Sequence, residues 1–505
     1  MIVKVLYDFD GQPGSAELTI RSGEVLTVTR QDIGEGWWEG TDQKGNTGLF
    51  PAAYVEAADN QDFWDDEWDD DSDGGAPPST IAESVTSSKP ALHSIGSNAE
   101  DSSAKRAPSV KVKPINKSSF AKSGSDSYIT GTLQLSVPES EKVYILESEY
   151  GLIWNPVNEP YDCAVASPKK ESKLKGLKSF IVYQLTPSFN NIQVSRRYKH
   201  FDWLHERLEE KFSLIPIPPL PDKQIAGRYE EQFIEHRKNQ LQAFVDCVCR
   251  HPVLSKCGVW QHFLTCTDEK RWKAGKRKAE RDELVGANYF FAIEAPNRPL
   301  GSFTAEQETE SFSRYIHGMD VAIKNLSNVV NDQVKKWQTL YKREYQRIGH
   351  SFIAYGQAYG MEEQSGYSRA HVMEAIKETG HSYNEVGKLF DEQPKLDWEP
   401  LGDMLHIYKG IITAFPDILT IHKGALQKRR ECDRLAAESK MDSPQLQEAS
   451  KRTDNVSYAL LAEMNHFHAE QLSEISKTFK SFLTQQIAFH KKIVDQLENA
   501  LSRFE

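Results

Sequence analysis

The most constraining feature of this chain is a long run of apolar residues spaced three and four positions apart. The first run extends from Phe312 to Tyr355, which is about six heptads and much longer than a helix of an ordinary globular domain. A second run extends from Leu401 to Ile418, and a third from Leu460 to Phe504. This spacing predicts long amphipathic helices in the C-terminal part of the chain.

The predicted helices are too long to bury their apolar faces alone. A third helix from Gln445 to Phe504 would measure about 90 Å, and three such helices present more apolar surface than a single bundle can cover. We therefore expect the region to dimerise. Pro394 and Pro400 interrupt the pattern before the second run, and Pro416 lies within that run. Proline kinks a helix, so we expect the dimer to form a curved rod.

The rest of the chain contains further modules, because a length of 505 residues predicts about three or four domains. The N-terminal residues lack the cleavage site of a signal peptide. No apolar run approaches the roughly 18 residues that span a bilayer. We therefore expect any membrane contact to be peripheral and the protein to be cytoplasmic.

Charge is segregated along the chain, whose formal net charge is -12. Residues 59–73 are rich in Asp and Glu and contain no Lys or Arg, whereas residues 270–281 are strongly basic. This separation predicts different partners for different segments.

The cysteines raise the question of a zinc site. Cys247 and Cys249 lie near two further cysteines and two histidines, but their spacing differs from the usual metal-binding hook and the stretch has a helical pattern. We therefore predict reduced, mostly buried thiols and no bound metal.

Residues 1–58 show short alternating segments separated by Gly and Asp turns, which predicts a small β-barrel. The order of the aromatic residues in this segment resembles that of an SH3 domain. The resemblance implies a groove for a polyproline II ligand, formed by Tyr7, Phe9, Trp37, Pro51 and Tyr54. It also implies an acidic position facing the basic residue of the ligand, at Glu17 with Asp32 and Glu35 as weaker candidates. The alternative is that the aromatic residues form the core, but so small a barrel has too little interior for them.

Residues 59–125 are rich in Ser, Asp, Gly, Pro and Lys and poor in aliphatic residues, which predicts a disordered tether. An acidic run in a tether is usually a solvated spacer. This one contains Phe63, Trp64 and Trp68, and exposed Trp has little reason to persist unless it docks. The motif resembles peptides that bind clathrin and clathrin adaptors.

The central part of the chain alternates strand-like and helical stretches and contains charged patterns that resemble a PX domain. Arg197 and Tyr198 precede an amphipathic helix. A proline loop ends near Lys223, and Arg237 lies on a helix with an apolar opposite face. An inositol ring with phosphates needs charge-assisted hydrogen bonds and a stacking face.

The resemblance assigns a role to each of these side chains. It implies that Arg197 binds a ring phosphate and that Tyr198 stacks beneath the inositol. Lys223 and Arg237 would bind the remaining phosphate and hydroxyl groups. Scattered surface cations are the alternative, which is stronger for Lys223 than for Arg197. The proline loop also fits a second pattern, because Pro218, Pro221 and Lys223 have the spacing of an SH3 ligand, so the two modules could mask each other.

The long helices are typical of a BAR domain, which binds membranes by charge. The candidate membrane-facing cations are Lys335, Lys336, Lys428, Arg430 and Arg434. For any single one, a solvated helix face is an equally good interpretation, although grouped cations attract anionic lipid more strongly. The basic segment 270–281 with Trp272 could also lie at the membrane interface, despite a poor apolar stripe.

Taken in order, these modules resemble the SH3–PX–BAR sorting nexins of the sorting nexin 9, 18 and 33 subfamily. The fold class is then multidomain, with a small all-β SH3 barrel, a disordered acidic linker, an α+β PX domain and an all-α, three-helix antiparallel BAR coiled coil that dimerises. The expected ranges are 1–58 for SH3, 59–125 for the linker, 141–267 for PX, 268–300 for a basic connecting segment and 301–505 for BAR.

The resemblance implies an endocytic adaptor that binds phosphoinositide membranes and senses or generates curvature. It implies recruitment of dynamin and Wiskott–Aldrich-type proteins, contact with clathrin and clathrin adaptors, and a place on the plasma membrane, coated pits and endocytic vesicles. No catalytic residue, cofactor or nucleic-acid partner is expected. Two alternatives remain, a signalling scaffold of the oxidase-organising type and a lipid-modifying enzyme, for which the chain has no room.

Overall fold

The protein is described by a computed structural model that covers residues 2–5, 9, 11, 16–21, 24–30, 36–42, 45–57, 124–173, 178–223, 230–361 and 367–505. The chain forms two compact units, residues 1–108 and 109–505, and each is described by itself. No helix in these ranges combines the length and the apolar character needed to cross a bilayer.

The N-terminal unit contains a five-stranded sheet whose neighbouring strands are antiparallel. Its strands have the order β4-β3-β2-β1-β5, with bounds β1 (Ile2–Val5), β2 (Val25–Arg30), β3 (Trp37–Thr41), β4 (Thr47–Pro51) and β5 (Val55–Ala57). Alternation along the strands turns mainly aliphatic residues inward, and the core consists of Val3, Val5, Leu18, Ile20, Leu26, Val28, Phe50 and Val55. This is the small all-β module that the sequence predicts.

The second unit contains a three-stranded sheet covered by helices. The strands β8 (Cys163–Lys173), β9 (Lys178–Pro187) and β10 (Val194–Arg197) have the order β10-β9-β8. The helices that follow are α3 (Tyr198–Lys211), α4 (Glu231–Arg250), α5 (Gly258–Thr265) and α6 (Glu269–Ala279). Helix α3 buries Phe201, Leu204 and Leu208 at helical spacing, so its apolar face lies on the core.

A second, smaller sheet lies beside the long helices. It contains β6 (Val143–Ser148), β7 (Gly151–Trp154) and β11 (Ile293–Glu294) in the order β11-β6-β7. Asn465 donates a hydrogen bond to the Leu152 carbonyl at 2.9 Å, which ties the edge strand to the last helix. The range predicted for PX includes β6 and β7, so the domain boundaries stay predictions.

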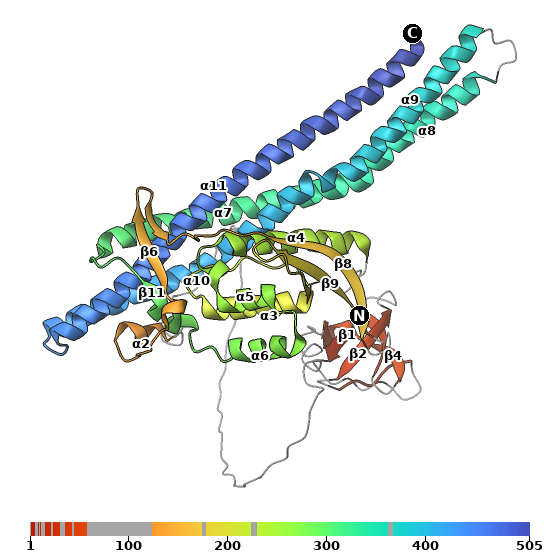
Figure 1. Cartoon of the computed structure of the whole chain (residues 1–505). Coiled ribbons are helices and arrows are strands. Elements are labelled where there is room, and N and C mark those ends of the chain that lie inside the picture. The colour runs from red at the N-terminus through yellow and green to blue at the C-terminus, as the bar shows by residue number, and fades with distance from the viewer. Residues whose placement is uncertain are drawn as a thin grey trace, which may run out of the picture. The chain divides into compact units, whose positions relative to one another are not determined.

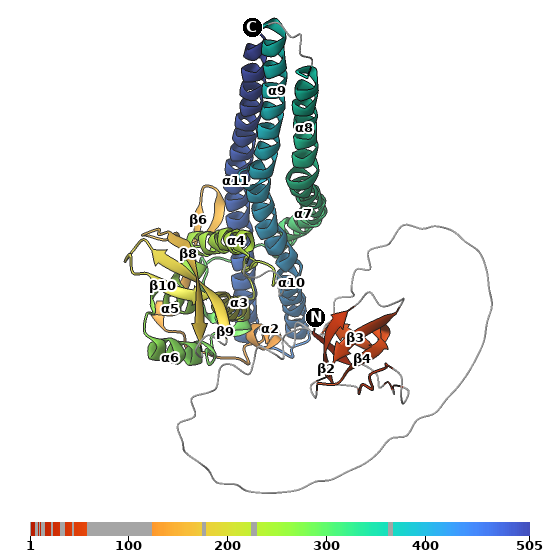
Figure 2. The same cartoon turned by 90° about the vertical axis from the view of Figure 1, so that its right-hand side faces the viewer.

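The long helices form an arm whose segments lie antiparallel (Figures 1 and 2). Its first helix is α7 (Ser302–Lys336), a π-helical segment (Trp337–Tyr341) and α8 (Lys342–Tyr359). Its second is α9 (Tyr367–Glu392), a 3-10 turn (Gln393–Lys395) and α10 (Trp398–Ala437), and its third is α11 (Ser443–Leu501). The predicted three-helix antiparallel arm is confirmed.

Two details of the predicted helices are wrong. The second helix starts at Tyr367 rather than near Leu401. Glycines on α9 hid its apolar period, because a Cβ on Gly380 would come within 2.6 Å of the Gly349 carbonyl oxygen on α8. The second helix breaks near Pro394, but Pro416 lies inside the continuous helix α10. Phe415 and Ile418, which flank this proline closely, are both buried, and this packing holds the helix through it.

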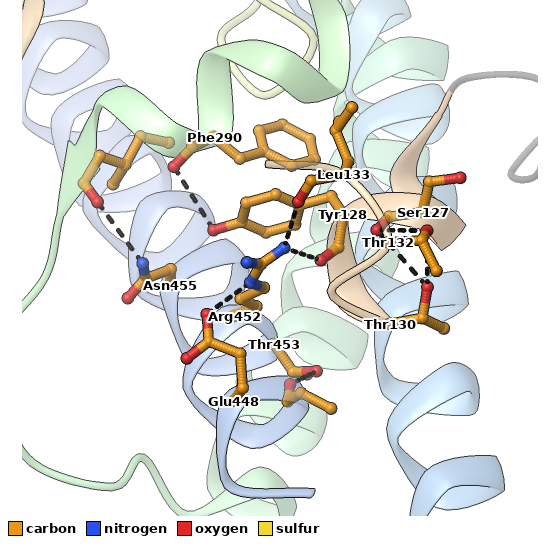
Figure 3. A network of polar contacts seen from close by, with 12 residues as sticks. Ser127, Tyr128, Thr130, Thr132, Leu133, Phe290, Glu448, Arg452, Thr453 and Asn455 are labelled. Atoms are coloured by element: carbon orange, nitrogen blue, oxygen red, sulfur yellow. Dashed lines mark hydrogen bonds and ion pairs between the residues drawn. The ribbon is translucent and has the colours of Figure 1, made fainter. Parts of the chain in front are cut away.

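A short helix, α2 (Ser125–Ile129), is fastened to the start of α11 (Figure 3). The Arg452 guanidinium donates hydrogen bonds to the carbonyl oxygens of Tyr128 at 2.6 Å and Leu133 at 3.0 Å. It also lies over the ring of Phe291, 5.1 Å from its centroid. One side chain thus joins the segment before the β-sheets, the segment after α6 and the helical arm.

The sheets and the arm share one hydrophobic core. The same cluster of buried side chains includes Leu204 of α3, Trp154 of β7, Ile412 of α10 and Leu460 of α11. Because side chains of both regions interdigitate there, the sheets and this part of the arm are packed as one unit.

Candidate lipid-binding site and peptide groove

The aromatic residues predicted for the peptide groove gather outside the core of the N-terminal sheet. The ring of Phe9 lies 5.7 Å from Trp37 and 6.1 Å from Tyr54, both in edge-to-face geometry. Pro51 pairs with Trp37 across β3 and β4. These four positions form one ridge of the kind that a polyproline II helix needs.

Of the other positions predicted for the groove, Glu17 is the one that lies within the described residues. Glu17 forms an isolated bridge with Leu49 and is half-buried. Tyr7, Asp32 and Glu35 lie outside the described residues, as do Phe63, Trp64 and Trp68 of the acidic motif.

The predicted phosphate-binding arginine lies where β10 meets α3, and strand alternation separates it from its neighbour. Arg196 is buried and donates to the carbonyl oxygens of Phe263 at 2.9 Å and Cys266 at 2.7 Å. Burial lowers the pKa of Arg196 to about 10. Arg197 points to the other face, and its guanidinium lies 4.8 Å from the centroid of Phe180. Arg196 is therefore a structural residue, whereas the ligand role of Arg197 stays a prediction.

Tyr198 and Arg237 are in contact at the centre of the predicted pocket. The Arg237 guanidinium lies 4.2 Å from the Tyr198 ring centroid and donates to the Asp222 carbonyl at 3.0 Å. The Tyr198 hydroxyl donates to the Pro221 carbonyl, and burial raises the pKa of this phenol, which keeps it a donor. Since Arg237 covers one face of the ring, an inositol could stack only on the other.

Lys223 stands at the exposed end of the proline loop. Its ammonium lies 3.0 Å from the Asp202 carboxylate, one turn after Tyr198 on α3, and its side chain is 70% exposed. The loop therefore ends beside the same face of α3 that carries Tyr198. A phosphate would have to compete with Asp202 for this lysine.

The proline loop itself is packed against α10 of the arm. The Leu220 carbonyl lies 2.9 Å from His406 Nε2, and the Pro218 carbonyl lies 3.0 Å from His205 Nε2 of α3. Pro219 fits against Gly410, where a Cβ would come within 2.3 Å of its ring. Pro218 and Pro221 are buried, so this loop is not accessible as an SH3 ligand, and the masking hypothesis is wrong for this arrangement.

The cations predicted to face the membrane on the arm are mostly in ion pairs. Lys428 contacts Asp126 at 3.0 Å and is half-buried. The other pairs are Arg430 with Glu306 at 2.6 Å, Arg434 with Glu438 at 2.7 Å and Lys336 with Asp332 at 2.6 Å. Lys335 is exposed and has no ionic partner among the described residues.

Helix α6 carries a further basic surface that the sequence indicated only as a segment. Trp272 is buried, with its ring stacked on His262 at 5.4 Å and the Arg196 guanidinium 4.3 Å from it. The tryptophan therefore anchors α6 on the PX fold instead of facing a membrane. The exposed side of the helix and its end carry Lys270, Arg271, Arg277, Lys278 and Arg281.

The cysteines are free thiols distributed through the core. Cys163, Cys249, Cys257 and Cys432 are buried, and Cys247 and Cys266 are half-buried. Within the described part of the chain, no three His, Cys, Asp or Glu side chains gather in a way that could hold a metal ion.

The fold and these sites together define a modular membrane adaptor with a peptide-binding sheet, a lipid-binding domain and a long helical arm. Three family models match the chain in this order. They are "Variant SH3 domain" over residues 5–56, "PX domain" over 184–267 and "WASP-binding domain of Sorting nexin protein" over 268–505.

Two of the relatives below match over nearly the whole chain, and a third over most of it. It is 37% identical to "Sorting nexin lst-4" of Caenorhabditis elegans, with 100% of both proteins covered. It is 35% identical to "Sorting nexin-33" of Xenopus tropicalis, with 99% of both covered. It is 41% identical to "Sorting nexin-18" of Mus musculus over 70% of this chain and 58% of that protein. The chain belongs to the SH3–PX–BAR sorting nexins, in the subfamily of sorting nexin-18 and sorting nexin-33.

A solved structure shows the same fold at low identity. The structure described as "The cryo-EM structure of the SNX-BAR Mvp1 tetramer" matches with a TM-score of 0.52 and 17% identity, covering 67% of this chain and 100% of that one. Membership of this family makes the chain a membrane-trafficking adaptor that associates peripherally with membranes, and the family is built from adaptor domains instead of catalytic ones.

Proposed function

We propose that the chain binds phosphoinositide membranes through Arg197, Tyr198, Lys223 and Arg237 and transmits that binding directly to the helical arm. The observation that carries the proposal is the proline loop. Its carbonyl groups accept from Tyr198 and Arg237 on one side, and it packs on His406 and Gly410 of α10 on the other. A headgroup in the pocket would therefore orient the arm on the membrane.

The arm is proposed to work as a homodimer that senses or generates curvature. Apolar side chains on the C-terminal part of α11 are exposed at helical spacing, namely Phe479, Leu483, Ile487, Val494, Leu497 and Leu501. Exposed residues on the first helix add Ile348, Phe352 and Tyr355. A second copy of the arm would cover this stripe, since contiguous apolar surfaces of this kind mark interfaces.

The remaining modules are proposed to recruit partners. The ridge of Phe9, Trp37, Pro51 and Tyr54 suits proline-rich sequences such as those of dynamin and Wiskott–Aldrich-type proteins. For a different region, residues 268–505, the description of the matching family names WASP binding. The acidic motif with Phe63, Trp64 and Trp68 is proposed to bind clathrin and its adaptors. The sites of action would be the plasma membrane, coated pits and endocytic vesicles.

Vesicle sedimentation combined with electron microscopy tests the proposal. Wild type is expected to bind vesicles that contain phosphoinositide and to draw them into tubules, and Arg197→Gln is expected to lose the phosphoinositide-dependent part of binding. The matched control is Lys256→Gln, which removes one exposed cation beyond the opposite end of α4. Equal loss in both variants would contradict a specific pocket.

The same experiment separates the adaptor from the scaffold of oxidase-organising type. A scaffold would bind phosphoinositide through the same pocket but would leave vesicles round. The exposed apolar stripe on the arm favours the adaptor, because a scaffold has no need of it. Vesicle binding by wild type without tubules would overturn the curvature part of the proposal.

A further inference from the structure

The first and second helices of the arm each contain an irregular segment, and the two segments lie side by side. The first contains the π-helical segment Trp337–Tyr341, and the second contains the 3-10 turn Gln393–Lys395, while α11 continues unbroken from Ser443 to Leu501. The arm changes direction in this region, between α7 and α8 and between α10 and α9 (Figures 1 and 2). We call the residues that meet here the joint, which comprises Trp337–Tyr341, Gln393–Trp398 and Gln485–Phe489.

Aromatic side chains fill the centre of the joint. The ring of Trp337 lies 5.0 Å from Phe390, 6.3 Å from Trp398 and 4.8 Å from Phe489. These partners come from both sides of the break in the second helix and from α11. Trp337, Phe390 and Phe489 belong to a cluster separate from the main core, so this part of the arm has its own packing.

Two polar contacts near Trp337 join the first helix of the arm to the second. Lys342 at the start of α8 lies 2.8 Å from Asp391 at the end of α9. Gln338 in the π-helical segment donates to Glu399 in the first turn of α10 at 3.2 Å. One contact reaches the second helix before its break and the other reaches it after the break. The two breaks are therefore held next to each other.

A buried carboxylate fastens the break in the second helix to the third helix. Asp397 is 1% exposed and accepts hydrogen bonds from Gln393 Nε2 and from Gln486 Nε2 of α11, both at 2.8 Å. It also accepts from the Trp398 backbone N–H as the N-cap of α10. Gln393 donates in addition to the Gln485 carbonyl at 3.2 Å. Among the described residues, no cation pairs with Asp397.

A buried carboxylate without a cation is a poor way to gain stability, because removing its charge from water is unfavourable. Burial accordingly raises the pKa of Asp397, against the hydrogen bonds from Gln393, Trp398 and Gln486. The carboxylate oxygens of Asp397 keep both amide donors only when the second helix and α11 hold their present relative position. A different bend would leave a buried acceptor and two amide donors unpaired, so the network selects one geometry.

We propose that the joint, through Asp397 and Gln486, sets the bend of the arm and thereby the membrane curvature that the dimer prefers. This inference rests on the proposed function, in which the arm bends membranes. Asp397 and Gln486 would be positioning residues, since they act by joining the second helix of the arm to α11.

Two variants and one control test the joint. Asp397→Asn places an amide next to two amide donors, and Gln486→Leu removes the contact with α11 without altering the N-cap. Both are expected to give a longer dimer in small-angle X-ray scattering and wider, less uniform tubules on vesicles of phosphatidylcholine, phosphatidylserine and phosphoinositide. The control is Asp442→Asn, which alters the exposed N-cap of α11 and is expected to match wild type.

Circular dichroism and light scattering establish that the variants are helical dimers. If Asp397→Asn fails to fold, Gln486→Leu decides alone. Folded variants with the scattering profile and tubule diameter of wild type would overturn the inference. If wild type forms no tubules, the proposed function fails, whereas the scattering of the free dimers still decides whether the joint sets the bend.

Discussion

Helix α11 passes through two different environments. In its first part, nearly every residue from Arg452 to Met464 is buried against α10, the small sheet and the segments that carry the PX fold. In its last part, Leu483 and Ile487 are each 57% exposed and Leu501 is 64% exposed. The apolar period continues through both parts. One helix therefore serves as a domain core at one end and presents an uncovered surface at the other.

Under the proposed function, this difference lets one end of the chain be stable by itself while the other end binds a second copy. The covered half holds the small sheet and α2 on the arm through Asn465, Arg452 and Glu463. The open half leaves its apolar side chains to a partner. Changes in the two halves should accordingly have different consequences, and the experiments below follow from the largest expected effect to the smallest.

The largest effect is expected for the double variant Leu483→Glu and Ile487→Glu. Covering a large apolar side chain contributes about 1.5–3 kcal/mol, so this variant should weaken dimerisation by about 4 kcal/mol, on the order of 1,000-fold. Light scattering over a range of concentrations should show a monomer that keeps its helicity.

The control for the open half is Ser481→Glu with Lys492→Gln. It changes the net charge by the same amount at exposed positions away from the stripe. If this control dissociates the dimer equally, charge and not the apolar surface is responsible.

The next largest effect is expected from acid, which should lower the folding stability of the covered half of α11. Burial lowers the pKa of His466 to about 4 and that of His422 to about 4, below the ordinary value near 6.5. Both are neutral when folded, so their contribution is complete above about pH 6.5 and is lost as pH falls towards 4, by at most about 3 kcal/mol each. Urea unfolding at pH 7.5, 6 and 5 measures this loss.

Glu463, a neighbour of His466, should also lose its contribution to stability in acid. His466 faces His251, Glu463, Glu470 and Arg250. Burial would raise the pKa of Glu463, but His251 and Trp154 lower it overall, so its contribution is also lost in acid. His466→Gln should flatten the pH dependence, and an unchanged slope would show that this histidine is not the titrating group.

A smaller effect is expected at Arg452. Arg452→Met leaves the buried carbonyl group of Tyr128 and the half-buried one of Leu133 without their donor, which should favour local opening of residues 125–133 by about 2 kcal/mol. Hydrogen exchange of those amides should then be about 30-fold faster. Lys451→Met, at the exposed neighbouring position, should leave exchange as in wild type.

The smallest effect is expected for Lys335 near the open half. Lys335→Gln removes an exposed cation from the end of α7, and a cation near an anionic surface contributes about 1 kcal/mol. Vesicle affinity should fall about 5-fold at low ionic strength and converge with wild type in high salt. Lys480→Gln on α11 provides the comparison, and an equal loss there would argue against a membrane face on α7.

The roles assigned to the pocket residues stay predictions, whereas their positions in the fold can be compared with the structure. The strand-to-helix position of Arg197 and Tyr198 follows from alternating and helical spacing, and the structure brings Tyr198 against Arg237. The seat of the proline loop on Gly410 was not predictable, because a glycine far along the chain carries no pattern that names its partner. Strand alternation could have shown beforehand that Arg196 is structural.

The arm was predicted from its period, but two of its properties depend on contacts that the period does not show. Helix α9 was missed because glycines replace apolar residues where α8 approaches closely. Grouped cations were taken as a membrane face, yet Lys428 and Arg430 are paired with Asp126 and Glu306, which lie far away in the sequence. Ion pairs of this kind depend on which elements become neighbours.

The sequence by itself determined the order of the modules, the long helices and the aromatic and basic residues of the two candidate binding sites. It did so because periodicity, turn chemistry and side-chain type act over short stretches of chain. Only the tertiary structure decided which half of α11 is covered, which cations are paired and where the arm bends. Those properties arise from contacts between distant segments, such as Asp397 with Gln486, and no local pattern encodes them.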